Sequence, residues 1–258
     1  MIKEKMNNNY IKGCFMKIVD STAMVFLAKN ANFDFLFYDM EHAMFNLQTI
    51  HNCALLAKSN NIGIFVRAPE CSKGYVSRIL DAGANAIMVP MVESREQAIK
   101  LRDWSKYPPL GNRGYAGGAN TMYAPSGNHE SNMLNLNKET ITIAQIETVQ
   151  GIAHVEEIVS VDGIDAIIVG PADLSISLGI PDGKDTIELY KNIKIVQDCC
   201  RKYHKAFGII GKLELMEQFK DYLQIAISAI DTNCILESLN RYNKEYDRLL
   251  KKEIHDGK

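Results

Sequence analysis

The sequence predicts a single-domain (β/α)8 barrel of the α/β class, and three observations support this fold. Short apolar runs alternate with longer amphipathic runs along most of the 258 residues. The apolar runs are continuous rather than alternating in polarity, which is typical of strands buried on both faces of a parallel sheet. Eight such runs are present, each followed by a helical pattern, and eight βα units close a barrel. An open doubly wound sheet is the alternative, but the chain lacks the glycine fingerprint that usually opens one.

The strands are expected where apolar residues cluster next to turn-forming residues. Phe33–Asp39 illustrates the pattern, because its apolar and aromatic residues from Phe35 to Tyr38 lead directly to an acidic end. The predicted strands are Gly13–Val19, Phe33–Asp39, Gly63–Ala68, Ala86–Val92, Thr142–Thr148, Asp165–Gly170, Ala206–Gly211 and Gln224–Asp231.

The helices are expected between these strands, where apolar residues recur at helical spacing. Ser21 is a suitable N-cap for the first of them, and Gly83 stands where a left-handed residue would end the third. The predicted helices are Ser21–Lys29, Leu47–Lys58, Tyr75–Ala82, Glu93–Trp104, Gln150–Val159, Ile187–Tyr203, Leu213–Tyr222 and Ser238–Glu253.

No linker divides the chain, so residues 1–258 are expected to form one domain. Residues 1–12 form a polar N-terminal segment, and residues 236–258 form a charged C-terminal helix. Residues 107–138, which follow the fourth strand and are rich in Gly, Asn and Pro, are expected to be a long loop. A loop of this length is either functional or mobile.

The composition narrows the classes of partner and compartment. The formal net charge is −2, with 29 Lys and Arg against 31 Asp and Glu, so no nucleic-acid partner is expected. No apolar run is long enough to cross a bilayer, and the N-terminus lacks the apolar core of a signal peptide. The six cysteines show no C-x-x-C spacing, which indicates reduced thiols in a cytoplasmic protein rather than disulfides or a zinc site.

Two acidic residues follow neighbouring predicted strands and are the candidate metal ligands. Glu147 ends the fifth strand, and Asp173 follows the sixth. The carboxyl ends of barrel strands carry the active site, so these side chains are expected to meet there. Two carboxylates without His or Cys suit Mg²⁺ or Mn²⁺, which keep open positions for water and substrate oxygens. The alternative is structural: Asp173 caps a short helix, and Glu147 pairs with a nearby base.

His42 is the candidate general base, because imidazole titrates near neutral pH. Asp39 lies three residues earlier and can orient the ring in one tautomer. Arg67 ends the third strand and can bind an oxyanion or a carboxylate with its planar fork. The alternative, which can hold at the same time, is an ion pair between Arg67 and one of the site acids. Lys212, after the seventh strand, is a rival nucleophile through a Schiff base, but two acids arranged for a metal would then be redundant.

Several of these residues stand in longer motifs whose order and spacing run from about Gly13 to Asp231. Through them, the chain resembles the HpcH/HpaI family of class II, metal-dependent pyruvate aldolases. The matching stretches include Asp39-Met40-Glu41-His42-Ala43, Leu80-Asp81-Ala82-Gly83-Ala84, Tyr107-Pro108-Pro109-Leu110-Gly111-Asn112-Arg113-Gly114, Gln145-Ile146-Glu147-Thr148 and Gly170-Pro171-Ala172-Asp173-Leu174-Ser175.

The resemblance implies a barrel in which Glu147 and Asp173 hold a divalent ion, Mg²⁺, Mn²⁺ or Co²⁺. It implies that Asp39 and His42 act together as a base dyad. It also implies that Arg67 binds the keto or enolate oxygen of pyruvate. The reaction implied is reversible cleavage of a 4-hydroxy-2-oxo acid to pyruvate and an aldehyde. Family members are commonly hexamers that exchange the last helix between subunits, so a homo-oligomer is expected. The residues expected to bind the substrate are Arg67, Gln145, Gly170, Pro171, Ala172 and Asp173.

Two other functions remain open. One is a CoA-ester lyase of the malyl or citramalyl type, although such chains are usually longer and need a nucleotide pocket. The other is a non-catalytic barrel that binds a small oxo acid. The sequence also departs from the family after the seventh strand, at Gly211-Lys212-Leu213-Glu214, so the residues that select the aldehyde are not assigned.

Overall fold

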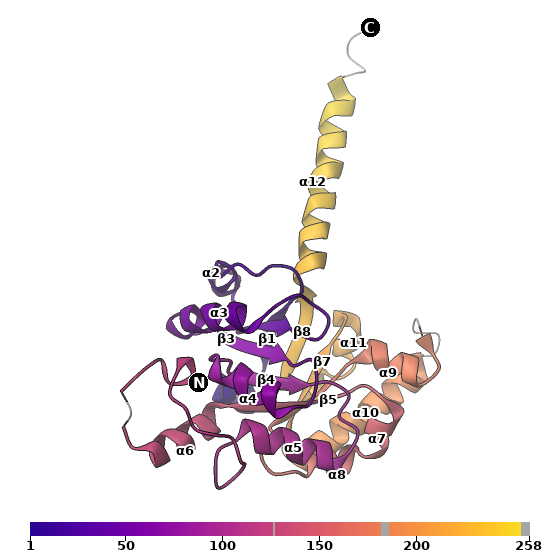
Figure 1. Ribbon diagram of the computed structural model, residues 1–258. Coiled ribbons are helices and arrows are strands. Elements are labelled where there is room, and N and C mark those ends of the chain that lie inside the picture. The colour runs from indigo at the N-terminus through magenta and orange to yellow at the C-terminus, as the bar shows by residue number, and fades with distance from the viewer. Residues whose placement is uncertain (126, 182–185, 254–258) are drawn as a thin grey trace.

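Eight parallel strands close into a barrel in which each strand pairs with the next along the chain and β8 pairs with β1 (Figure 1). The computed structural model describes residues 1–125, 127–181 and 186–253. The predicted (β/α)8 fold is confirmed, and each predicted strand overlaps an observed one. The strands are β1 (Ile11–Met16), β2 (Phe35–Asp39), β3 (Gly63–Arg67), β4 (Ala86–Val89), β5 (Ile141–Ile146), β6 (Ala166–Val169), β7 (Ala206–Ile210) and β8 (Ile225–Ile230).

The continuous apolar runs arise because successive strand residues enter two different cores. Phe35 and Phe37 point into the barrel interior, where Phe35 stacks on Phe65 with ring centroids 4.1 Å apart. Leu36 and Tyr38 point outward into the layer between the barrel and its helices. Both faces of the strand exclude water, so apolar residues are required at every position.

The outer helices begin and end largely where the sequence predicts. Ser72 caps α4 by accepting a hydrogen bond from the backbone N–H of Tyr75, and Gly83, with φ +107°, follows its C-terminus as expected. One N-cap prediction is wrong: the first outer helix starts at Met24, not after Ser21, and its N-cap residue Ala23 makes no side-chain hydrogen bond. The helices after β1 to β4 are α2 (Met24–Asn30), α3 (Leu47–Ser59), α4 (Lys73–Asp81) and α5 (Arg95–Ser105).

Two predicted helices are interrupted in the second half of the barrel. The segment after β5 breaks at His154 into α7 (Val149–Ala153) and α8 (Val155–Val159). The segment after β7 becomes α11 (Leu213–Glu217) and a 3₁₀ turn at Lys220–Tyr222. The other helices in this half are α9 (Pro171–Ser177) after β6 and α10 (Thr186–Lys202).

Two helices were not predicted from the sequence. Residues 107–138, expected to be a loop, contain most of α6 (His129–Glu139). The polar N-terminal segment contains α1 (Ile2–Asn8), which lies across the N-terminal end of the barrel and places Met6, fully buried, in the interior core. Lys3 fixes this helix through an ion pair with Asp165 of 2.7 Å.

The C-terminal helix α12 (Asp231–Glu253) starts earlier than predicted and projects away from the barrel (Figure 1). Its first residue, Asp231, is buried and accepts hydrogen bonds from the backbone N–H groups of Lys17, Ile18 and Val19. This carboxylate therefore fixes the loop after β1 at the mouth of the barrel. Across the described residues, no helix combines the length and apolarity that a bilayer crossing requires.

Candidate active site

The site residues predicted after β2, β3, β5 and β6 meet at the carboxyl end of the barrel. Parallel strands all end on the same side, so residues far apart in the chain converge there. Asp39 and Arg67 are direct register partners on β2 and β3. Glu147 follows β5, and Asp173 lies in the first turn of α9, after β6.

Arg67 and Asp39 form a buried two-point ion pair. Arg67 Nε lies 2.8 Å from Asp39 Oδ1, and Nη2 lies 2.7 Å from Oδ2. Burial alone would favour the protonated acid, but the hydrogen bonds and charge of Arg67 lower the pKa of Asp39. Likewise, burial opposes the arginine charge, but Asp39 raises the pKa of Arg67. Both groups therefore stay ionised, and the guanidinium is held in one orientation before any substrate arrives.

His42 is placed differently from the expected dyad. Asp39 Oδ1 accepts from the backbone N–H of His42 and Glu41, at 3.3 and 3.1 Å, rather than from the imidazole. The carboxylate nearest the ring is Glu41, whose Oε2 lies 3.5 Å from His42 Nε2. Both carboxylate oxygens of Asp39 already bind Arg67, so Asp39 does not orient the imidazole of His42, which is 60% exposed at the mouth.

Glu41 is the functional candidate whose contacts the sequence did not predict. Its Oε2 lies 3.1 Å from Arg67 Nη1, yet this buried atom makes no hydrogen bond of good geometry with any described residue. Burial raises the pKa of Glu41, with Arg67 acting in the opposite direction. The only sequence signal was its position in the acidic cluster directly after β2.

Glu147 is buried beside two groups that position its carboxylate. Its Oε1 accepts the backbone N–H of Met91 at 2.9 Å, and its Oε2 accepts from Gln145 Nε2. Burial, and then the negative charge of Asp173, raise the pKa of Glu147 to about 7. Gly170 gives this carboxylate its space, because a Cβ there would lie 2.5 Å from Glu147 Oε2.

Asp173 is exposed at the mouth and makes no hydrogen bond or ion pair with any described residue. It stands at the third position of α9, whose N-cap is Gly170 and whose first residue is Pro171. The structural alternative, in which the side chain of Asp173 caps this helix, is therefore wrong. The carboxylate is instead free to bind a ligand next to Glu147, whose pKa its charge raises.

The residues fit a hard divalent cation. They provide two carboxylates near one another, a glycine where a side chain would fill the cradle, and the buried Oε1 of Gln145, which has no partner among the described residues. No group of three or more His, Cys, Asp or Glu residues in the described chain is arranged to hold a metal. Glu147 and Asp173 would therefore leave several coordination positions to water and substrate oxygens, as Mg²⁺ prefers.

Two other basic residues lie outside this site. Lys212, the candidate Schiff-base lysine, is exposed at the N-cap position of α11 and has none of the burial that activates such lysines. Arg113 is not a solvated loop residue: its side chain is 1% exposed, pairs with Asp81 at 2.6 Å and stacks over Tyr107.

A model of the HpcH/HpaI aldolase/citrate lyase family matches residues 13–225. Among curated proteins, the hydroxypyruvate/pyruvate aldolase of Roseobacter denitrificans is 35% identical over 206 residues, which cover 77% of each chain. The 2-keto-3-deoxy-L-rhamnonate aldolase of Escherichia coli K12 is 32% identical over 195 residues, covering 76% of this chain and 73% of that protein.

Solved structures show the same architecture. An HpcH/HpaI aldolase from Desulfitobacterium hafniense superposes with a TM-score of 0.87 at 28% identity, over 96% of both chains. The citrate synthase SbnG superposes with a TM-score of 0.85 at 26% identity, over 96% of this chain and 98% of that one. Proteins named for different carbon–carbon bond reactions thus share this barrel, so the reaction has to be argued from the site.

Proposed function

The chain belongs to the HpcH/HpaI aldolase/citrate lyase family, and from this premise we propose that it is a carbon–carbon lyase of the class II pyruvate aldolase type. It would reversibly cleave a 4-hydroxy-2-oxo acid to pyruvate and an aldehyde. The observation that carries the proposal is the convergence of Glu147, Asp173 and the Arg67–Asp39 pair at one end of the barrel.

Glu147 and Asp173 would hold the divalent ion, with Mg²⁺, Mn²⁺ and Co²⁺ as the candidates. When bound, such an ion is a Lewis acid that stabilises negative charge on the oxygen of a 2-oxo acid. Arg67 adds a fixed positive charge to the same region, and its pairing with Asp39 means that it need not reorganise during the reaction.

The substrate carboxylate is assigned to the start of α9. Pro171 has no N–H, but the backbone N–H groups of Ala172 and Asp173 face no earlier turn of the helix and are free to donate. Gln145 would bind the substrate through its amide, which has an unpartnered buried oxygen.

His42 is assigned the proton transfer. Its exposed ring takes the proton from the 4-hydroxyl group of the substrate, and the carbon–carbon bond between C3 and C4 breaks. The aldehyde leaves, the bonding electrons remain on the pyruvate fragment as its enolate, and protonation at C3 gives pyruvate. Glu41, 3.5 Å from the imidazole, would stabilise the protonated ring.

The direct test is a coupled assay for pyruvate release from 4-hydroxy-2-oxo acids, with pyruvate and a panel of aldehydes in the reverse direction. Activity should require an added divalent ion and should disappear with chelator. Chelator-resistant activity that borohydride traps on Lys212 would instead support the Schiff-base alternative. Cleavage of malyl-CoA in preference to every free acid would support the CoA-ester lyase alternative.

Metal binding is expected to release a proton below neutral pH. The pKa of Glu147 is raised to about 7, so the metal-free protein carries a proton there at pH 6 that an ion must displace. Calorimetry in two buffers of different ionisation heat should give close to one proton released per Mn²⁺ at pH 6 and almost none at pH 8.5. Zero release at pH 6 would contradict the assignment of Glu147 as a ligand.

We further propose that the protein is a cytoplasmic homo-oligomer assembled through α12, with a hexamer as the expected form. Five apolar residues recur on this helix at spacings of four, three, four and three residues, which is the pattern of a helix-packing seam. Each is between 41% and 63% exposed, although a monomeric helix would normally bury such a stripe. These residues are Ile235, Leu239, Tyr242, Tyr246 and Leu249.

Lysine on this stripe should dissociate the assembly. A Leu239→Lys and Tyr246→Lys double variant would place two charges in the buried seam, so light scattering after size exclusion should show a smaller species than the parent. The control carries Asn240→Lys and Asp247→Lys on the polar side of the same helix and should keep the parent mass. Equal masses for both double variants would argue against assembly through α12.

A further inference from the structure

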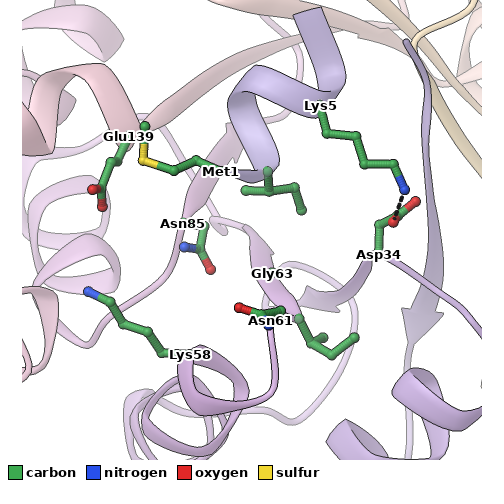
Figure 2. A pocket seen from close by; sticks show the side chains of 10 residues that line it. Met1, Lys5, Asp34, Lys58, Asn61, Gly63, Asn85 and Glu139 are labelled. Atoms are coloured by element: carbon green, nitrogen blue, oxygen red, sulfur yellow. Dashed lines mark hydrogen bonds and ion pairs between the residues drawn. The ribbon is translucent and has the colours of Figure 1, made fainter. Parts of the chain in front are cut away.

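A second hollow lies at the opposite end of the barrel from the carboxylate site. It encloses about 500 Å³, within the range of small-molecule sites, between α1, the end of α3, the start of β3 and the end of α6. Figure 2 shows it below the N-terminal helix, with Lys5 paired to Asp34 on one side and Lys58, Asn85 and Glu139 on the other. The proposed aldolase mechanism uses none of these residues.

Three polar side chains gather on one side of this hollow, and each keeps at least one polar group without a partner among the described residues. Lys58 and Glu139 make no ion pair with each other or with any described residue, although their charges are opposite. Asn85 is fixed because its Oδ1 accepts from the backbone N–H of Ile64 at 2.8 Å, and its amide nitrogen faces the same space without an acceptor. The wall thus provides an ammonium group, an amide donor and a carboxylate.

A small recess adjoins the hollow and shares Lys58, Asn85 and Glu139 with it. Its volume of about 30 Å³ suits a single small polar group. Arg113 lines this recess with a side chain that is only 1% exposed, and its Nε has no hydrogen-bond partner among the described residues. A buried guanidinium N–H without an acceptor is costly, so an acceptor group on a ligand in this recess would be stabilised.

We propose that this hollow is a binding site for a free α-amino acid. The ligand carboxylate would accept from Lys58, from the Asn85 amide and, in the recess, from Arg113. The ligand ammonium would donate to Glu139, and the side chain would lie toward Ile2 and Ile62 in the wider part of the hollow. Each unpaired group on the wall then gains a partner of the correct type.

Ligands with one charge fit the same wall less well. A simple oxyanion would be repelled by Glu139, and a simple amine would be repelled by Lys58 and Arg113. A zwitterion whose ammonium and carboxylate groups are attached to the same carbon satisfies both. The hollow shares no residue with the carboxylate site, so its occupancy can be tested independently of the proposed aldolase activity.

The test is calorimetric titration of the full-length, metal-free protein with each of the proteinogenic amino acids. At least one is expected to bind with a Kd below about 1 mM. The matching 2-oxo acid, which lacks the ammonium group, and the matching amine, which lacks the carboxylate, should each bind at least about tenfold more weakly, because each loses a charge-assisted hydrogen bond.

Two surface variants test whether the amino acid binds in this hollow. Lys58→Gln and Glu139→Gln should each weaken the amino acid at least about tenfold, because each removes one of the two charges. Glu130→Gln, a matched change of an exposed acid on the same helix α6, should leave the affinity unchanged. No binding by any amino acid below about 1 mM, or equal affinity in the Glu139→Gln and Glu130→Gln proteins, would overturn the proposal.

Discussion

Replacing His42 with alanine is expected to reduce aldol cleavage by about 10²- to 10⁴-fold, the range that a positioned general acid or base contributes. The ring is exposed at the barrel mouth, and Glu41 is its one close charged neighbour in the part of the chain that the structure describes, so its loss should not disturb the core. Binding of oxalate in the presence of Mg²⁺ should stay within about twofold of the parent, because the carboxylates and Arg67 are untouched.

The matched control is His51→Ala. This histidine lies on α3, and its ring contacts the hydroxyl of Tyr123 at 3.4 Å rather than any site residue. The control should keep near-parental turnover. Near-parental turnover in the His42→Ala protein, measured as pyruvate release, would remove His42 from the mechanism and leave Glu41 as the remaining base candidate after β2.

Replacing Glu147 with glutamine is expected to lower Mn²⁺ affinity by more than about a hundredfold and to abolish turnover. Even the loss of a residue that only hydrogen-bonds to a metal ligand typically lowers metal affinity or activity by about ten- to a hundredfold. Glutamine keeps the shape of the side chain but removes one of two charged ligands. The exposed Glu70→Gln, in the loop after β3, is the control and should bind Mn²⁺ like the parent.

The same Glu147→Gln variant should stabilise the metal-free protein at high pH. The folded-state pKa of Glu147 is raised to about 7 by burial, so the protein favours the protonated acid and loses stability as the pH rises from about 4.5 to 7. Above pH 7 the buried negative charge is fully present, and glutamine removes it. The melting temperature should therefore rise at pH 8 and change little at pH 4.5; a lower melting temperature at pH 8 would show a purely structural role.

The barrel could be predicted because its strands are buried on both faces and are therefore apolar at nearly every position. Residues such as Leu36 and Phe37 face different cores but are both fully buried, so each strand reads as an unbroken apolar run. The turn-forming residues were only partly informative, because Gly83 follows the end of α4 as expected but Ser21 does not cap the first outer helix. The helices α1 and α6 were missed because they are mostly polar: α6 buries no residue, and α1 buries only Met6.

The members of the candidate site could be predicted, and so could an ion pair between Arg67 and a site acid, but the sequence did not say which acid is the partner. Strand ends identify Asp39, Arg67, Glu147 and Asp173, since any polar residue there faces the barrel mouth. Pairing requires the β2–β3 register, which places Asp39 opposite Arg67 and not against the ring of His42. The burial of Arg113 could not be predicted either, because Arg113 lies in an irregular segment and its partner Asp81 is the last residue of α4.

The central claim is that Glu147 and Asp173 hold a divalent ion that stabilises the enolate of pyruvate. The most direct measurement is exchange of the methyl protons of pyruvate for solvent deuterium, followed by proton NMR without any aldehyde present. We expect exchange only with Mg²⁺, Mn²⁺ or Co²⁺ in the parent protein, and none in the Glu147→Gln or Asp173→Asn proteins. Exchange that continues at the parental rate in excess chelator, or in either variant, would contradict the claim.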